Sequence, residues 1–192
     1  KQAIEGVMRP SRCLADFVAP QSSGIADYAG MFAVTAGIGA EKKEAQFMAE
    51  LDDYSSIMFK SIADRLAEAF AECLHHRVRT DLWGTSPQES LSIDDLVNEK
   101  YTGIRPAPGY PACPDHSAKQ EMFDVLQCAE IGMGLTESLA MTPAASVSGF
   151  YIGHPDSTYF NVGKIAEDQL QDLARRRGVP EKDLQRLLAP NL

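Results

Sequence analysis

The sequence predicts an α+β fold with an antiparallel sheet, and three observations lead to that prediction. A long helical repeat of apolar residues runs from 41 to about 79. Strand-like segments lie on either side of it, at 27–37 and 135–163. Helices and strands therefore come in unequal blocks, not in the strict alternation that is typical of parallel sheets. A length of 192 residues with 44% apolar residues fits one domain with its own core.

The first strand and the long helix follow from their side-chain patterns. Residues 27–37, DYAGMFAVTAG, carry Tyr28 and Phe32 among residues that favour strands, and Gly37 and Gly39 end the segment. In the helix, apolar residues recur in steps of three or four, at positions 47, 51, 54, 58, 62, 66, 70 and 74. One straight helix of this length would measure roughly 55 Å, so we expect a break or a bend.

Short helices are predicted in the middle of the chain. Ser92 is a candidate N-cap for a helix over 91–101, which Gly103 ends. Asp115 or Ser117 can cap a further helix that runs to about residue 131.

The C-terminal part predicts strands and then two amphipathic helices. The segment 135–163 is typical of two or three strands, with a turn at Pro143 and another at GHPDS. Gly178 closes the first of the two last helices, and Pro180 lies near the start of the second.

Charge and composition exclude several classes of function. A net charge of −9 argues against broad binding to nucleic acids or anionic membranes, which requires basic surface. No run of 18 apolar residues occurs, so no transmembrane helix is predicted, and no signal peptide is recognisable. The four cysteines form no C-x-x-C pair, and we expect free thiols in the cytoplasm. Because the chain begins with Lys1, we expect a piece of a longer protein.

A loop with four prolines, GIRPAPGYPACPDH at 103–116, is the strongest candidate for a binding site. Proline fixes its own φ and restrains the preceding residue, so the loop loses little entropy when a ligand orders it. Arg105 can hold a carboxylate through two parallel hydrogen bonds, and Ala107 offers a fixed backbone edge that can read a base. Gly109 allows a close backbone approach, and Tyr110 offers an aromatic face and a hydroxyl. The alternative is a stiff connector packed on the surface.

Carboxylates near this loop predict that the ligand carries a positive charge. Asp64, Glu68 and Glu72 stack on one side of the long helix, and Glu99 lies close to the loop in sequence. Such groups stabilise a sulfonium or an ammonium in a shielded cleft. For Glu72 and Asp64, a solvated helix face is the favoured interpretation.

Apart from two aromatic residues, little else in the sequence predicts chemistry. Tyr159 and Phe160, in HPDSTYF, follow a turn and can stack on an adenine, although packing on the sheet explains Phe160 equally well. Cys113 and His116 make at most half of a metal site. No G-x-S-x-G, G-x-G-x-x-G or Walker A motif occurs, so nucleophilic catalysis by the domain itself is not predicted.

Several segments together resemble the activation domain of cobalamin-dependent methionine synthase. They are CLADFVAP, DYAGMFAVTAG, DRLAEAFAECLHHRVR, GIRPAPGYPACPDH, LTESLAM, ASVSGFY and HPDSTYF, and the similarity runs from about residue 10 to the final LAPNL. The resemblance implies a single C-shaped α+β domain, with a bent antiparallel sheet flanked by helices, over residues 1–192. The family domain has a further N-terminal stretch that this sequence lacks, so a truncated domain is implied.

The resemblance implies that the domain binds S-adenosylmethionine and presents its methyl group to cob(I)alamin during reductive reactivation. The parent enzyme is a methyltransferase that moves a methyl group from methyltetrahydrofolate to homocysteine. The implied partners are the cobalamin-binding domain of the same enzyme, which holds most of the cobalamin, and flavodoxin or an equivalent reductase. Zinc belongs to a separate module of the parent enzyme.

The resemblance also places eight residues around the S-adenosylmethionine, with no catalytic residue and no metal ligand among them. They are Arg105, Ala107, Gly109, Tyr110, Tyr159, Phe160, Glu99 and Glu68. Arg105 matches the arginine that holds the carboxylate, Ala107 matches the residue whose backbone reads the adenine, and the two glutamates match acidic positions near the sulfonium. The competing hypothesis is an interaction module without a ligand site, which docks the cobalamin domain and flavodoxin.

Overall fold

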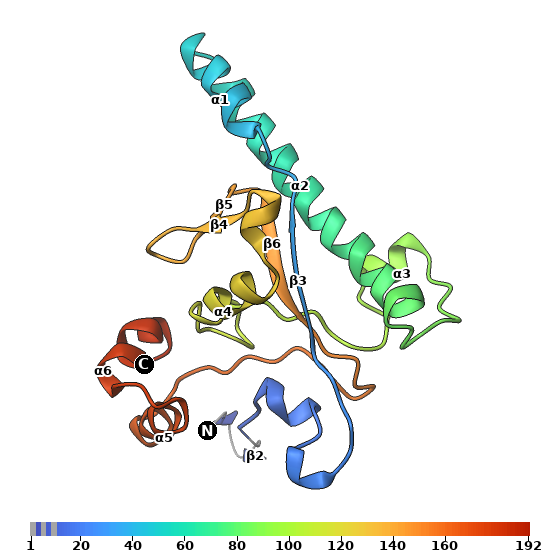
Figure 1. Cartoon of the computed structure of the whole chain (residues 1–192), viewed down its shortest axis with the longest axis vertical. Coiled ribbons are helices and arrows are strands. Elements are labelled where there is room, and N and C mark those ends of the chain that lie inside the picture. Colours follow the sequence, from blue (N-terminus) through green and yellow to red (C-terminus); the bar gives the residue numbers. More distant parts are fainter. Residues whose placement is uncertain (1–2, 5–6, 9–10) are drawn as a thin grey trace.

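The structure is a computed structural model that describes residues 3–4, 7–8 and 11–192. It confirms the α+β class: helices surround short antiparallel strands (Figure 1). The strands are β1 (Ala3–Ile4), β2 (Val7–Met8), β3 (Gly30–Thr35), β4 (Gly134–Leu135), β5 (Met141–Thr142) and β6 (Ser146–Tyr151). The α-helices are α1 (Ala40–Ala49), α2 (Asp53–Arg77), α3 (Ile93–Val97), α4 (Ala118–Val125), α5 (Glu167–Arg177) and α6 (Glu181–Leu187).

The central element is the antiparallel pair of β3 and β6, in a register that runs from Gly30↔Tyr151 to Thr35↔Ser146. Helix α2 lies against this pair, and Ala71 of the helix packs with Phe32, Val34 and Tyr151 of the strands. Pairing elsewhere is also antiparallel, β1 with β2 and β4 with β5. The described residues therefore form three two-stranded sheets, with the main core between α2 and the β3–β6 pair.

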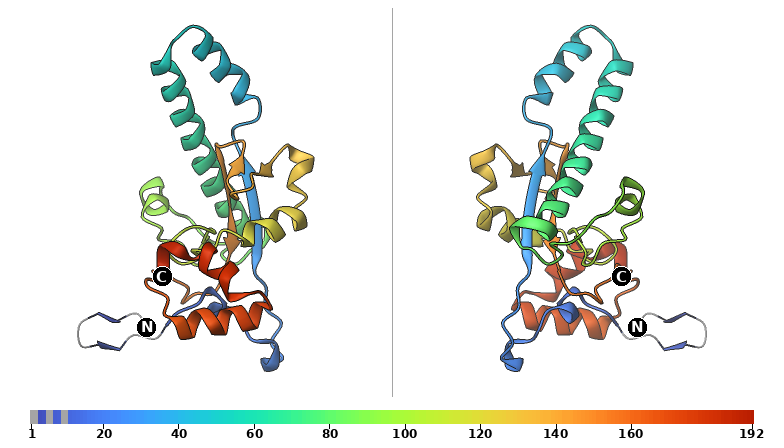
Figure 2. Two further views of the ribbon diagram at one scale, coloured as in Figure 1. Left: turned by 90° about the vertical axis from the view of Figure 1, so that its left-hand side faces the viewer. Right: turned by 90° about the vertical axis from the view of Figure 1, so that its right-hand side faces the viewer.

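The long helical repeat is broken, as its length predicts. Helix α1 ends at Ala49, Leu51 takes a left-handed φ of 56°, and α2 begins at Asp53. Asp52 caps the new helix, because its Oδ1 accepts a hydrogen bond from the Ser55 N–H at 3.0 Å. The two helices form a hairpin that projects from the rest of the molecule (Figure 2).

The face of α2 that meets the sheet is not the face with the large apolar residues. The buried positions are small or polar, namely Ser56, Ala63, Ala67, Ala71 and His75. The large apolar residues of the periodic pattern are 44–74% exposed, namely Tyr54, Met58, Ile62, Leu66 and Phe70. We call these five side chains the apolar stripe of α2. A helix with two apolar faces normally packs on both, so the stripe is a candidate contact surface.

Two of the shorter predicted helices end earlier than expected. Ser92 is the N-cap of α3, with a capping box to Asp95, but this helix ends at Val97, well before Gly103. Helix α4 ends at Val125, where Gln127 takes a positive φ, and a 3₁₀ turn over Cys128–Ile131 follows.

The C-terminal helices form a separate small core. Leu170, Ala174, Leu184 and Leu188 are buried together between α5 and α6. Figure 2 shows this pair at the end of the molecule opposite the tip of the α1–α2 hairpin. In the part of the chain that the structure describes, no helix is long and apolar enough to cross a membrane.

Candidate functional site

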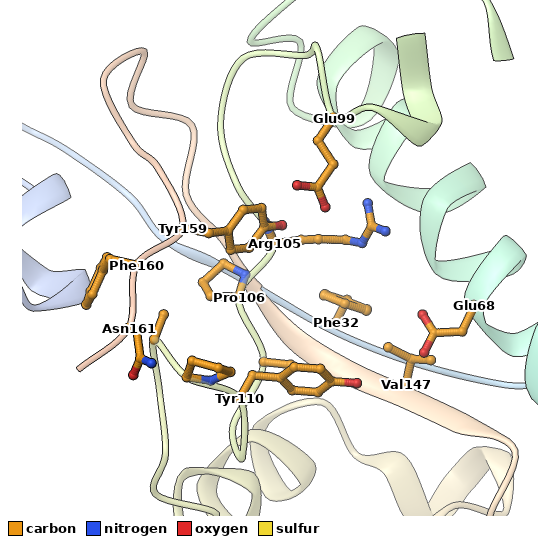
Figure 3. A pocket seen from close by; sticks show the side chains of 13 residues that line it. Phe32, Glu68, Glu99, Arg105, Pro106, Tyr110, Val147, Tyr159, Phe160 and Asn161 are labelled. Atoms are coloured by element: carbon orange, nitrogen blue, oxygen red, sulfur yellow. The ribbon is translucent and has the colours of Figure 1, made fainter. Parts of the chain in front are cut away.

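A pocket of about 530 Å³ lies between the proline loop, α2, the β3–β6 pair and the segment 159–161 (Figure 3). This volume is within the usual range for sites that bind small molecules. Its lining residues are Phe32, Glu68, Glu99, Arg105, Pro106, Ala107, Tyr110, Pro111, Ala112, Val147, Tyr159, Phe160 and Asn161.

The proline loop is fixed to the edge of β6. Ile104 and Ile152 exchange two backbone hydrogen bonds of 2.9 and 3.0 Å, and the Phe150 N–H donates to the carbonyl oxygen of Pro106 at 2.8 Å. On the other side of the loop, the Val162 N–H donates to the Pro111 carbonyl at 2.9 Å. The loop is therefore fixed on both sides by backbone hydrogen bonds and is not a loose connector on the surface.

Hydrogen bonds within the loop use several of its backbone donors but leave that of Ala107, a residue that lines the pocket, available to a ligand. The Tyr110 N–H donates to the Ala107 carbonyl at 3.2 Å, and the Gly109 N–H donates to the Cys113 carbonyl at 2.7 Å. Gly109 has a φ of +96°, and a Cβ there would lie 2.0 Å from the His116 ring, so the turn requires glycine. Among the described residues, the Ala107 N–H has no hydrogen-bond partner.

Arg105 is anchored by only one of its three nitrogens. Its Nη1 donates to Glu72 Oε2 at 2.5 Å and to the Tyr101 hydroxyl at 2.9 Å. The Nε and Nη2 groups form no hydrogen bond with any described residue, although the side chain lines the pocket. Burial lowers the pKa of Arg105, but Tyr101 and Glu72 more than offset this, so the pKa is raised and the charge is retained.

Behind Arg105, a second arginine supports Tyr101. The guanidinium carbon of Arg79 lies 4.0 Å from the centre of the Tyr101 ring, and this arginine binds Glu89 through two hydrogen bonds of 2.8 and 2.7 Å. His75 packs edge-on against the Tyr101 ring. Burial, reinforced by the charges of Arg79 and Arg105, lowers the pKa of His75 to about 3, so this ring is neutral at neutral pH.

The predicted acidic residues separate into three positions. Glu68 and Glu99 line the pocket, on opposite sides of the Arg105 guanidinium as Figure 3 shows. Asp64 lies away from this pocket and lines a different cavity, near the start of α1. Glu72 is not on a solvated helix face, because its carboxylate is partly buried against Arg105.

The predicted aromatic residues stand at the pocket wall. The Tyr159 hydroxyl accepts a hydrogen bond from the Arg105 backbone N–H at 3.1 Å, which joins the segment 159–161 to the proline loop. Phe160 lines the pocket while its ring also packs near Phe17, with centroids 6.3 Å apart. Tyr110 is 60% exposed and lies across the pocket from Tyr159 (Figure 3).

The pocket brings together seven of the eight predicted site residues. Gly109 is the exception: it shapes the turn of the loop and does not line the pocket. Contact of these residues with a ligand remains a prediction. Sequence reasoning placed Phe32 in a strand but did not assign it or Val147 to the site, where both line the pocket from paired strands. It also missed Tyr101, which lies four residues before Arg105 and binds its side chain.

The described residues contain no cluster of three or more metal-ligating side chains. Burial raises the pKa of the Cys113 thiol to about 11, so this group is protonated at neutral pH. His116 packs against Gly109 in the turn.

A comparison with protein families matches residues 1–178 to "Vitamin B12 dependent methionine synthase, activation domain". The chain belongs to this family. The activation domain is also similar to a solved structure described as "Crystal Structure of the MetH Reactivation Domain bound to AdoHcy", with 56% sequence identity and a TM-score of 0.91. The match covers 94% of this chain and 56% of that chain, so the chain spans little more than half of the matched protein. The family resemblance and the fold that it implied are thereby confirmed.

Proposed function

We propose that this activation domain binds S-adenosylmethionine in the pocket beside the proline loop and presents its methyl group for reactivation of a cobalamin-dependent methyltransferase. One observation carries the proposal: the free Nε and Nη2 groups of Arg105 and the free N–H of Ala107 lie in the same pocket. A carboxylate and a base edge are the groups that such donors recognise. The similar structure is bound to AdoHcy, which shares the adenosine and the amino acid of this ligand, and this supports binding of an adenosyl ligand by the domain.

The charges of the pocket fit the third feature of the ligand. Glu68 and Glu99 provide two carboxylates, while the charge of Arg105 is already balanced by Glu72. A sulfonium placed between carboxylates in a half-shielded pocket is stabilised more strongly than in water. We therefore assign Arg105 to the carboxylate, Ala107 to the adenine edge, and the two glutamates to the sulfonium.

The contribution of this chain to the reaction is positioning. Cobalamin, held mainly by an adjacent domain, supplies the nucleophile that takes the methyl group. The pocket holds the amino-acid and adenosine ends of the donor, which restricts the direction of its methyl group and raises its effective concentration. Tyr110, exposed at the pocket rim, is our candidate for the surface that faces the corrin.

Calorimetry with Arg105→Ala tests the proposal. Loss of a charge-assisted pair costs about 1.5–3 kcal/mol, so we expect affinity for S-adenosylmethionine to fall about 10- to 150-fold. Arg65→Ala, which removes an exposed arginine from α2, is the control and is expected to bind as the unmodified chain does. Unchanged affinity in Arg105→Ala would contradict the assigned role.

The parent activity and its partners are also proposals, because the chain spans only part of the matched protein. We propose the cobalamin-binding domain and flavodoxin, or an equivalent reductase, as partners in a cytoplasmic methyltransferase. The apolar stripe of α2 favours a second role as an interaction module, and we assign it to contact with the remainder of the longer domain. The two roles are compatible, since the stripe residues do not line the pocket.

A further inference from the structure

We propose that Glu72 and Tyr101 are positioning residues, which hold Arg105 so that only its Nε–Nη2 edge is presented to the ligand carboxylate. This inference rests on the function proposed above. Neither residue lines the pocket, so both would act through Arg105 and not by touching the ligand.

Both anchoring contacts of Arg105 are made by the same nitrogen of its guanidinium. Glu72 and Tyr101 both accept from Nη1, at 2.5 and 2.9 Å. The two remaining donor groups, Nε and Nη2, point along the same edge of the planar guanidinium, which is the edge that binds a carboxylate through two parallel bonds. The anchored nitrogen and the free edge therefore have separate tasks.

The groups that anchor Arg105 are themselves rigidly held. Tyr101 is 9% exposed, and its ring contacts both the Arg79 guanidinium and the His75 ring. Arg79 is in turn fixed by its two hydrogen bonds to Glu89. A flexible side chain such as arginine loses rotational freedom when it binds a ligand, and a pre-fixed one has less to lose.

The other carboxylate oxygen of Glu72, Oε1, is buried without a hydrogen-bond partner among the described residues. Burial of an unpaired carboxylate oxygen is unfavourable. The contact with Arg105 is therefore the interaction that stabilises the Glu72 carboxylate in this position. The contact therefore orients Arg105 at a cost to the local structure, which is expected of a residue that serves a binding site.

The test compares two ligands that differ in the carboxylate. S-adenosylhomocysteine carries it, and 5′-methylthioadenosine has the same adenosine and thioether without the amino-acid end. We expect Glu72→Ala to lower the affinity for S-adenosylhomocysteine by about tenfold, since a charge-assisted contact is no longer oriented. The affinity for methylthioadenosine should stay within about twofold of that of the unmodified chain. Tyr101→Phe, which removes only the hydroxyl, should change the two affinities in the same pattern but by less, and it keeps the test valid if Glu72→Ala does not fold.

Two controls separate the outcomes. Glu72→Gln retains an acceptor for Nη1 and is expected to restore part of the lost affinity, while Asp64→Ala, also on α2 but away from this pocket, is expected to change neither ligand. Equal weakening of both ligands, or unchanged binding of S-adenosylhomocysteine, contradicts the positioning role and leaves the proposed function intact. Failure of the unmodified chain to bind either ligand would instead overturn the proposed function and this inference with it.

Discussion

Gly149 lies in the middle of β6, where the proline loop crosses the strand, and its replacement by alanine should disturb the loop. A Cβ at this position would lie 2.7 Å from the carbonyl oxygen of Pro106 and 2.9 Å from Cε1 of Phe32. One neighbour is backbone and the other is a buried ring, so neither can move aside easily. The Pro106 carbonyl also accepts the Phe150 N–H at 2.8 Å, and a shift of the loop would strain that bond.

The expected size of the effect follows from the cost of overpacking. Insertion of one methyl group into a packed contact costs about 1–3 kcal/mol. For a chain of this size, each kcal/mol lowers the melting temperature by about 2–4 °C, so we expect a drop of roughly 2–12 °C in Gly149→Ala. Because Pro106 lies between Arg105 and Ala107, binding of the adenosyl ligand should weaken in the same variant.

Differential scanning calorimetry and ligand titration measure both effects. Gly134→Ala is the matched control: it also adds a methyl group to a strand glycine, but its nearest neighbour is the Thr142 hydroxyl at 3.2 Å. Equal melting temperatures in the two variants, with unchanged ligand affinity in Gly149→Ala, would refute the close approach of loop and strand on which the pocket depends.

Three further predictions concern α2 and the network behind Arg105. Leu66→Ser, on the apolar stripe, should change the free energy of unfolding by less than about 0.5 kcal/mol. Ala67→Leu, on the buried face, should lower it by about 1–3 kcal/mol. Equal effects of the two substitutions in chemical denaturation would contradict the observed orientation of α2. His75 has a pKa of about 3 in the folded chain, well below its ordinary value of 6.5, so the unfolded chain binds one more proton between these pH values. The free energy of unfolding should therefore fall as pH drops below 6.5, by up to about 1.4 kcal/mol per pH unit. In His75→Gln, the free energy of unfolding measured in urea should depend less steeply on pH between 6.5 and 5. Glu89→Ala should destabilise by about 3–5 kcal/mol, because it leaves the Arg79 charge buried and unpaired, and a loss below about 1 kcal/mol in urea unfolding would argue against that burial.

The sequence predicted the long helix, its break and the antiparallel class, because these depend on local patterns. It did not predict which face of α2 is buried. Ala67 and Ala71 allow close approach of the helix to the β3–β6 pair, whereas the larger Leu66 and Phe70 are left outside. Periodicity locates a helix, but it does not tell which of two adjacent apolar faces meets the sheet of the same chain.

For the candidate site too, the sequence predicted the local features and not the long-range contacts. The proline loop is local in sequence, so its role as a pocket wall could be recognised from proline and glycine positions. The contact between Glu72 and Arg105 joins residues 33 positions apart and carries no local signal. Asp64, Glu68 and Glu72 have the same helical spacing in the sequence, and only the fold distinguishes them. Asp64 lies outside the pocket, Glu68 lines it, and Glu72 binds Arg105.

Equilibrium dialysis of this 192-residue chain with labelled S-adenosylmethionine measures whether its pocket binds the methyl donor. We expect saturable binding at one site per chain with a Kd in the micromolar range, which corresponds to a binding free energy of about −8 kcal/mol. Absence of binding at millimolar ligand, with the chain folded by circular dichroism, would contradict the proposed function.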